Sequence, residues 1–221
     1  KTRRNSFSTR FKKQKKRSLM FNIQDQNYAK RTIKIFTFTI IIFLITLTLA
    51  IIFSPSLETF KNMTNGQHGN ISKTNGLIKL WQYIINNGFK VPFQMLILSL
   101  IPIPFLYFLN LLSTTIITGI AFGFAIHFDL NKGLLMVLSS IPHTIIELLA
   151  MCFVISGLYK LNKTIIRKIS NLFRKNKKQN FSFKLAFSNL LKIYFLIALP
   201  LYILAALLET YLTNFIYNLF T

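Results

Sequence analysis

The sequence predicts an all-α polytopic membrane helical bundle of about five transmembrane helices, with its N-terminus in the cytoplasm and its C-terminus outside. Of the 221 residues, 52% are hydrophobic and only 14% are charged, whereas a soluble domain carries about 25% charged residues. Long apolar runs separate the charged segments. The basic residues fall mainly into two blocks, and membrane topology produces such an unequal division between loops.

The first third of the chain predicts a basic arm, one crossing and an outside loop. Residues 1–34 hold 12 Lys and Arg against one acid, Asp25, and are predicted to form a basic cytoplasmic arm. Residues 35–53 are uncharged and close to the 20 residues or so that span a bilayer, so they predict the first transmembrane helix. The run is too long for the core of a secretory signal, so we expect it to remain as an anchor.

Residues 54–90 predict an extracytoplasmic loop that contains a short amphipathic helix. Apolar residues recur there at helical spacing, and Gly88 lies where a C-terminal cap is expected. The spaced residues are Leu77, Leu80, Trp81, Ile84 and Ile85. Trp side chains favour the membrane interface, so this helix is predicted to lie along the outer surface.

Residues 91–158 predict a three-helix membrane core. The apolar run at residues 91–128 is too long for one crossing, so it is expected to form two helices that turn near residues 110–113. Pro102 and Pro104 should interrupt the first of these, because proline removes a backbone donor and disfavours helix just before it.

The last predicted helix of this core covers residues 134–158 and follows a turn at residues 129–133. Residues 159–189 hold nine Lys and Arg and no acid. They predict a basic cytoplasmic loop with an amphipathic helix suited to an anionic leaflet. The basic residues assigned to the lipid surface are Lys163, Arg167, Lys168 and Arg174. Residues 190–221 are predicted to form the last transmembrane helix and an outside tail.

Counting charges supports this orientation. The two segments placed inside carry 12 and nine basic residues, while the segments placed outside carry five. The positive-inside rule therefore favours a cytoplasmic N-terminus, and the reversed orientation would violate it.

Two of the five acids fall inside predicted crossings. Glu147 lies near the middle of the fourth helix and Glu209 toward the outer end of the fifth. A charge at the bilayer centre costs about 2.5–3.5 kcal/mol on insertion scales, so each carboxyl needs a partner, a proton or a wet cavity. His143 precedes Glu147 by four residues and shares its helix face, about 6 Å away along the axis.

We interpret Pro142, His143 and Glu147 as one intramembrane polar site, with Asn110 and Glu209 as candidates to complete its network. Pro142 removes a backbone bond beside His143 and is expected to kink the helix. Three alternatives remain open for the site: interhelical hydrogen bonding alone, handling of a proton, ion or substrate, and contact with a partner protein. Gly119 and Gly123 form a G-x-x-x-G pattern, which permits close helix packing. Packing within the chain is favoured, and a homodimer is the alternative.

No catalytic residue can be assigned, and we expect a protein that is not an enzyme. The sequence has no G-x-S-x-G, P-loop or kinase signature. Cys152 stands alone, so a disulfide framework is excluded. His143 and Glu147 give H-x-x-x-E, whereas zinc proteases use H-E-x-x-H. We therefore expect no metal and no cofactor. The arrangement of basic residues around apolar runs argues against a nucleic-acid partner.

Several motifs together resemble the stage II sporulation protein M family. Residues 142–150 carry an H-x-x-x-E-L pattern that resembles the signature helix of that family, and residues 205–213 resemble its closing helix, with a Glu before an aromatic residue and a Thr. Weaker similarities are the Asn at position 110, the glycines at 119 and 123, and Asn131-Lys132-Gly133. The resemblance covers residues 105–213 in the order of the family and implies family roles for His143, Glu147 and Glu209.

This resemblance implies a bacterial membrane protein of about five helices with no known enzymatic activity. Its namesake anchors a complex with peptidoglycan-degrading enzymes, and relatives lie beside transporter genes or in circular-bacteriocin clusters. We therefore expect a multi-pass protein of the bacterial cytoplasmic membrane that acts as a scaffold or accessory subunit. Its expected partners are the bilayer with its anionic inner leaflet and other membrane or extracytoplasmic proteins, such as a transporter subunit or wall hydrolases. The alternative is a component for peptide or bacteriocin secretion or self-immunity that uses the His–Glu site.

Overall fold

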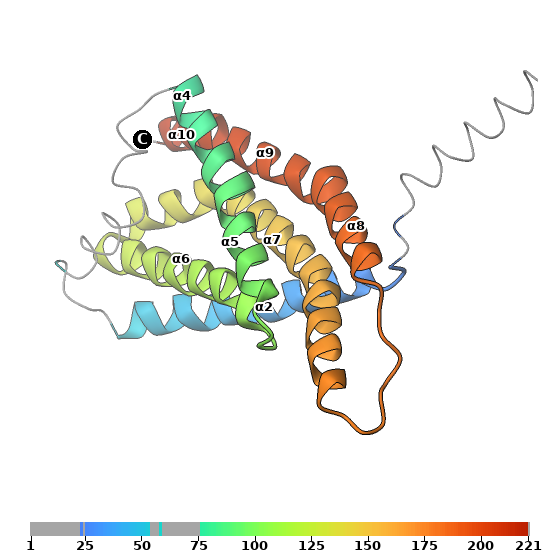
Figure 1. The fold of residues 1–221 in the computed structure, drawn as a ribbon. Coiled ribbons are helices and arrows are strands. Elements are labelled where there is room, and N and C mark those ends of the chain that lie inside the picture. The colour runs from blue at the N-terminus through green and yellow to red at the C-terminus, as the bar shows by residue number, and fades with distance from the viewer. Residues whose placement is uncertain (1–22, 24, 54–57, 59–75, 221) are drawn as a thin grey trace, which may run out of the picture.

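The computed structural model describes residues 23, 25–53, 58 and 76–220, and every regular element in this part of the chain is a helix (Figure 1). Most of the predicted basic arm and the loop at residues 59–75 lie outside these residues. In chain order the elements are α2 (Tyr28–Ile52), α4 (Leu77–Tyr83), η1 (Ile84–Lys90), α5 (Val91–Leu100), η2 (Leu106–Phe108), α6 (Leu109–Phe128), α7 (Leu130–Leu172), α8 (Phe183–Ile193), η3 (Tyr194–Ala198), α9 (Leu199–Leu207), η4 (Leu208–Leu212) and α10 (Thr213–Phe220).

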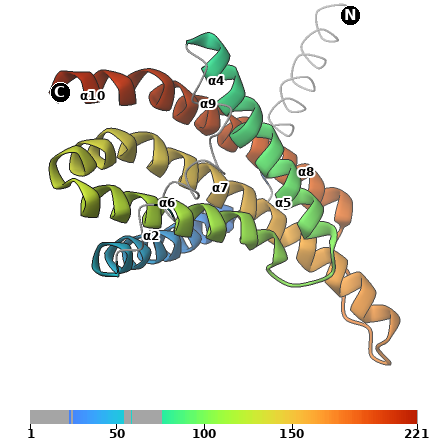
Figure 2. The same cartoon turned by 90° about the vertical axis from the view of Figure 1, so that its left-hand side faces the viewer.

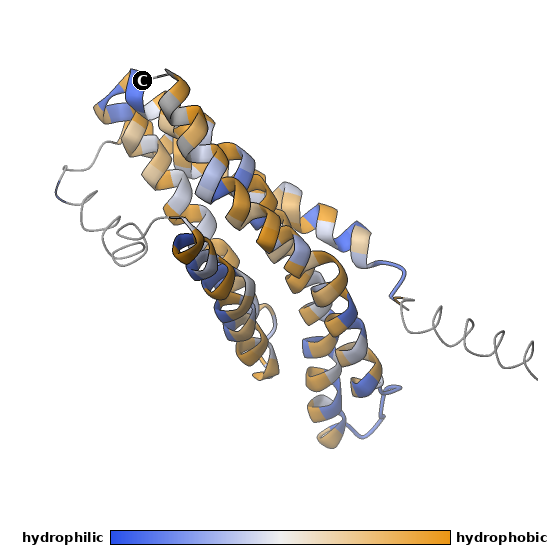
Figure 3. Cartoon of the chain, turned by 90° about the horizontal axis from the view of Figure 1, so that it is seen from above, coloured by the Kyte–Doolittle hydropathy of each residue, from blue (hydrophilic) through white to orange (hydrophobic). Residues whose placement is uncertain are grey.

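Four helical stretches are long and apolar enough to cross a membrane. They are Tyr28–Ile52, Leu106–Phe128, Leu130–Leu172 and Phe183–Leu212. Large apolar side chains of α2, among them Phe38, Ile41 and Ile45, are exposed, and hydrophobic residues recur along the described helices (Figure 3). The all-helical membrane bundle predicted from the sequence is therefore confirmed at this level of detail.

Helix α7 lies at the centre of the bundle and packs against α2, α5, α6, α8 and α9 (Figures 1 and 2). On one side it forms a group with α2 and α6, and on the other it packs against α5 and the α8–α9 helix. The largest fully buried side chains of the core include Met95, Tyr107, Leu111, Met151, Ile155 and Leu158. Each neighbouring helix therefore buries part of its surface on α7.

The predicted surface helix at residues 77–85 is part of a longer helix. α4, η1 and α5 follow one another without a break from Leu77 to Leu100. Gly88, expected as a C-terminal cap, is buried within the π-helical segment η1, and an added Cβ there would lie 3.6 Å from Tyr202 Cβ. This is an ordinary van der Waals distance, so the space does not require glycine, and the helix does not end at this residue.

The turn expected near residues 110–113 is at residues 101–105 instead. Pro102 and Pro104 end the helix: Ile101 is extended and Phe105 adopts a left-handed conformation with φ 65°. Asn162 on α7 donates hydrogen bonds of 2.9 Å to the carbonyls of Ser99 and Ile101. The helix end therefore receives its missing donors from a neighbouring helix.

Helix α7 extends beyond the predicted bounds of residues 134–158 at both ends. It begins at Leu130, where the Asp129 carboxylate accepts from the Lys132 amide at 3.0 Å as an N-cap. It runs through the basic amphipathic segment to Leu172. The prediction ended the helix where the bilayer was expected to end. The following amphipathic sequence contains no helix-breaking residue, so the helix continues beyond that point.

Helices α2 and α6 approach each other closely at the G-x-x-x-G pair. A Cβ added at Gly123 would lie 2.5 Å from Ala50 Cβ and 2.7 Å from the Leu47 carbonyl oxygen, and one added at Gly119 would collide with Thr46. Real Cβ atoms do not approach backbone this closely, so the two backbones require glycine here. The pattern therefore serves packing within the chain, as favoured from the sequence.

We expect Gly123→Val to separate α2 from α6 and to lower the free energy of unfolding by about 1–3 kcal/mol, the usual cost of overpacking. The measurement is thermal unfolding of the purified protein in mild detergent. Ile116→Val on the exposed side of α6 is the matched control and should change the melting temperature little. Equal melting temperatures for the two variants would contradict this account of the close approach.

An ion-pair cluster around the buried carboxylate of Asp25 ties the start of α2 to α7. Asp25 is 5% exposed, pairs with Arg31 and lies 3.4 Å from the Lys160 ammonium. Arg31 also donates to the Ser156 carbonyl at 2.9 Å, and the Ser156 hydroxyl donates to the Tyr28 carbonyl at 2.8 Å. Burial raises the pKa of Asp25, but the bond from Arg31 and the charges of Arg31 and Lys160 outweigh it, so the net pKa is below the ordinary value.

A lowered pKa in the folded state means that the Asp25 carboxylate stabilises the fold above the ordinary pKa of 3.8 and loses this contribution as the pH falls through the lower folded value. We therefore expect Asp25→Asn to lower the melting temperature at pH 7 and to reduce the further loss seen below about pH 4. Asp129→Asn is the control, because Asp129 is half-exposed and Asn also caps helices. An unchanged acid transition in Asp25→Asn would refute the assignment.

Candidate functional site

Glu147 lies on α7 opposite the π-helical segment η1. The side-chain amide of Asn87 donates a hydrogen bond toward the Glu147 carboxyl. Asn86 in turn donates to the Asn87 side-chain oxygen at 2.8 Å. The two asparagines therefore form a short hydrogen-bonded chain that ends on the carboxyl.

Glu209 lies in another π-helical segment, η4. The residues that contact its carboxyl come from the helix at residues 77–100, which also carries Asn87. The Tyr83 hydroxyl donates to its carboxyl, and Lys79 is close enough to interact with it electrostatically. The Lys79 ammonium also lies 5.8 Å from the centroid of the Tyr83 ring. Lys79, Tyr83 and Asn87 are spaced four residues apart, so they follow one face of the helix toward the interior.

The two carboxyls are within electrostatic range of each other, which makes them one cluster. Tyr202 on α9 lies beside it, since its hydroxyl interacts electrostatically with Glu147. Tyr202 is 1% exposed, and its hydroxyl has no hydrogen-bond partner among the described residues. We call Tyr83, Asn87, Glu147, Tyr202 and Glu209 the carboxyl cluster. A pair of carboxyls flanked by hydroxyl and amide groups can share a proton or bind a cation.

The carboxyl cluster is bordered by π-helical backbone, which is rare and is often found at functional sites. Segment η1 carries Asn87 and η4 carries Glu209. Within η1 the Gly88 carbonyl accepts a hydrogen bond of 2.5 Å from the Tyr194 hydroxyl. This bond joins η1 to η3, which is also π-helical.

The remaining residues of the predicted polar site have other partners. His143 lies 3.1 Å from the Thr213 hydroxyl through Nδ1, and Thr213 donates to the Ser139 carbonyl at 3.3 Å, close to Pro142. Asn110 lies in the first turn of α6 and donates to Gln94 at 3.1 Å. The predicted set therefore includes the two carboxyls of the carboxyl cluster, a His143–Thr213 contact and an Asn110–Gln94 pair.

Lys79, Tyr83, Asn87 and Tyr202 were missed in the sequence. The signal that was available was the pair Asn86-Asn87 between apolar residues at helical spacing. Because the segment was interpreted as a surface helix, its polar residues were assigned to water. Recognising one continuous helix from residue 77 to residue 100 would have placed Asn87 near the middle of that helix.

The predicted lipid-surface residues lie at the other end of the molecule, around the α7–α8 loop. Arg167 is 4.3 Å from the centroid of the Phe181 ring and donates to the Gln179 carbonyl at 3.3 Å. Lys163 lies over the same ring at 5.8 Å, and Lys168 lies 5.9 Å from the Phe183 ring. Arg174 is exposed. Three of the four cations thus order the loop through cation–π contacts.

Within the described residues, no group of three or more His, Cys, Asp and Glu side chains could hold a metal ion. Together with the apolar helices, the carboxyl cluster defines a helical integral membrane protein with a polar interior. The family model for stage II sporulation protein M matches residues 32–214, and the chain belongs to this family. The match includes Glu147 and Glu209, and the family prediction made from the sequence is confirmed. No curated protein and no solved structure matches the chain.

Removing one donor from the carboxyl cluster should destabilise the protein. We expect Tyr83→Phe to leave the Glu209 carboxyl short of a hydrogen bond and to cost about 1–3 kcal/mol of unfolding free energy. Tyr211→Phe is the matched control, because Tyr211 is exposed. Denaturant titration in detergent compares the two, and equal midpoints would show that the Tyr83 hydroxyl does not support the cluster.

Proposed function

We propose that this chain is a non-enzymatic, multi-pass protein of the bacterial cell membrane that acts as a scaffold or accessory subunit of a membrane complex. Membership of the stage II sporulation protein M family supports this role. The carboxyl cluster carries the proposal: the hydrogen bonds from Asn87 and Tyr83 engage both intramembrane carboxyls within the chain. Carboxyls engaged in this way hold helices together.

The proposed topology has five crossings, with the helix from Leu77 to Leu100 as the second. At 1.5 Å per residue this helix is about 36 Å long, enough for the roughly 30 Å of a hydrocarbon core. Its low hydropathy comes from residues such as Asn86, Asn87 and Gln94. Asn87 interacts with Glu147, and the exposed Gln94 accepts a hydrogen bond from Asn110, so both amides have partners within the chain.

Charge and contacts support a cytoplasmic placement for one end of the bundle. The start of α2 is bonded to α7 at Ser156, and the 101–105 turn is bonded to α7 at Asn162. The α7–α8 loop continues from the same end, and this region holds most of the basic residues. By the positive-inside rule this end faces the cytoplasm, which places the start of α4 and the end of α10 outside.

The cytoplasmic end of α7 is the surface on which we expect a partner protein. Beyond Asn162 the helix continues for almost three turns to Leu172. Leu172 and Phe173 are 78% and 85% exposed. We propose that these two adjacent apolar side chains, at the tip of a basic projection, contact another protein.

The second candidate function is a transport or export component. The observation that favours it is the electrostatic interaction between Glu147 and Glu209, together with the buried Tyr202 hydroxyl that has no partner among the described residues. Such a pair could bind and release a proton or a cation during transport. This candidate requires ionisable carboxyls, whereas the scaffold requires only their hydrogen bonds.

The test compares Glu147→Gln with Leu172→Ser/Phe173→Ser in a strain that lacks the native gene. Gln keeps an acceptor for Asn87, so Glu147→Gln should still recover the partner in a mild-detergent pull-down and restore the phenotype. The double Ser variant should lose most of the co-purified partner. Phe215→Ser, at a site on α10 that is 64% exposed, is the control.

Two outcomes would overturn the scaffold proposal. A chain that purifies alone and is fully active by itself needs no partner. A Glu147→Gln variant that keeps normal abundance and its partner but loses all activity would show that the carboxyl must ionise, in favour of transport.

A further inference from the structure

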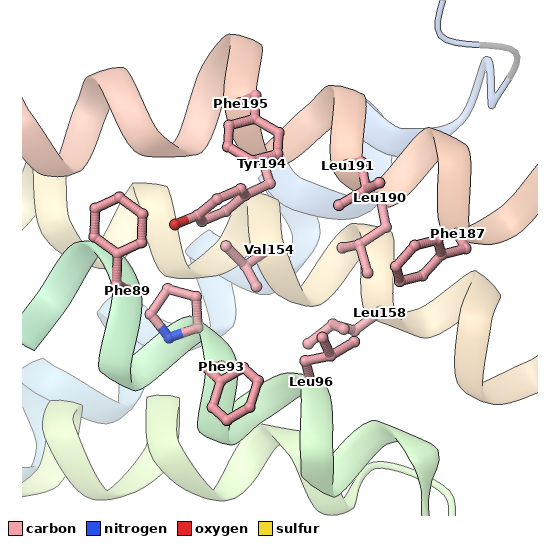
Figure 4. Close-up of a pocket in the computed structure, with 11 residues that line it drawn as sticks. Phe89, Phe93, Leu96, Val154, Leu158, Phe187, Leu190, Leu191, Tyr194 and Phe195 are labelled. Carbon is pink, nitrogen blue, oxygen red and sulfur yellow. The ribbon is translucent and has the colours of Figure 1, made fainter. Parts of the chain in front are cut away.

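An apolar groove runs along the bundle between α5, α7 and the α8–η3 helix (Figure 4). Its volume is about 210 Å³. Val154 and Leu158 from α7 form its floor, while Phe93 and Leu96 line one side and Phe187 and Leu191 the other. The groove does not include the carboxyl cluster, and the proposed scaffold role does not use it.

The lining of the groove offers almost nothing to a polar ligand. Among the residues that line it, the Tyr194 hydroxyl is the side-chain polar group, and it already donates to the Gly88 carbonyl at 2.5 Å. Burying a polar ligand against such walls would leave its hydrogen bonds unmade. The groove therefore suits an apolar chain.

The groove opens to the outside of the bundle. Phe93 and Phe195 at its rim are 62% and 55% exposed. In a membrane protein this surface contacts lipid, so an acyl chain has direct access.

The cytoplasmic end of the groove leads to positive charge. The ring of Phe187 stacks on Phe183, with centroids 6.2 Å apart and planes at 5°. The Lys168 ammonium lies 5.9 Å from the Phe183 ring. Lys184 precedes Phe187 by three residues and Leu191 by seven, so it follows the same face of α8, and it is exposed. Two cations therefore lie beyond the end of the groove.

We propose that the groove binds one acyl chain of an anionic phospholipid from the inner leaflet, with the phosphate of its headgroup held by Lys168 and Lys184. The apolar walls contact the acyl chain, and the two ammonium groups attract the anionic headgroup. A lysine near a membrane surface contributes about fivefold to the affinity for an anionic lipid. A zwitterionic lipid shares the acyl chain and lacks the net charge, so the site distinguishes the two.

The experiment measures phospholipid retained by the full-length protein. The protein is reconstituted in vesicles with equal amounts of phosphatidylglycerol and phosphatidylcholine, extracted in mild detergent, and examined by native mass spectrometry. We expect about one phospholipid per chain, enriched in phosphatidylglycerol. Lys168→Gln/Lys184→Gln should lower this preference by about fivefold for each lysine. Lys175→Gln/Lys177→Gln changes the same charge elsewhere in the loop and should leave it unchanged.

A second variant tests the groove itself. Leu191→Trp should fill the space and lower the retained amount of both lipids, whereas Leu204→Trp, at a similarly exposed site outside the groove, should not. Melting temperatures show that each variant is folded. Equal retention of the two lipids by the unaltered protein, equal effects of the two lysine pairs, or full retention by a folded Leu191→Trp would each overturn the proposal.

Discussion

Carboxyl groups placed among apolar helices need polar partners, and this requirement organises one side of the bundle. Glu147 and Glu209 come from two different helices, and their donors, Asn87 and Tyr83, come from a third. Hydrogen bonds to these carboxyls therefore select one arrangement of three helices that van der Waals packing alone would specify weakly. Apolar side chains offer no alternative donors, so Asn87 and Tyr83 of the helix from Leu77 to Leu100 are held toward the two carboxyls.

Helix α7 connects this polar side to the rest of the molecule. Toward its C-terminal end it provides Ser156 for Arg31 and Asn162 for the broken helix end at Ile101. The first bond gives the Arg31 guanidinium an acceptor. The second gives a donor to the Ile101 carbonyl, which lies at the helix end before Pro102. The opposite face of the bundle uses another principle, since α2 and α6 meet through glycine contacts.

The helical class, the main apolar helices and the family could be predicted from the sequence, because apolar runs and the motif around His143 and Glu147 are local patterns. The turn at residues 101–105 was missed although both prolines had been noted, because a charge-free apolar run gives no other sign of where it bends. The carboxyl cluster required long-range information: Glu147 was recognised as needing a partner, but nothing in the local sequence connects it with Asn87, 60 residues earlier. Bulged helices leave no periodic signal that would reveal them.

The π-helical segment η1 sets the relative orientation of two surfaces, the carboxyl cluster and the apolar groove. Each residue of an α-helix turns the chain by about 100°, and a bulge adds a residue, so it resets the angular phase between the two halves of the helix. Upstream, Tyr83 points toward Glu209, and downstream, Phe93 and Leu96 border the groove. Shortening η1 by one residue would rotate one surface relative to the other by about a quarter turn. The bulge thus lets a single helix serve two independently oriented faces.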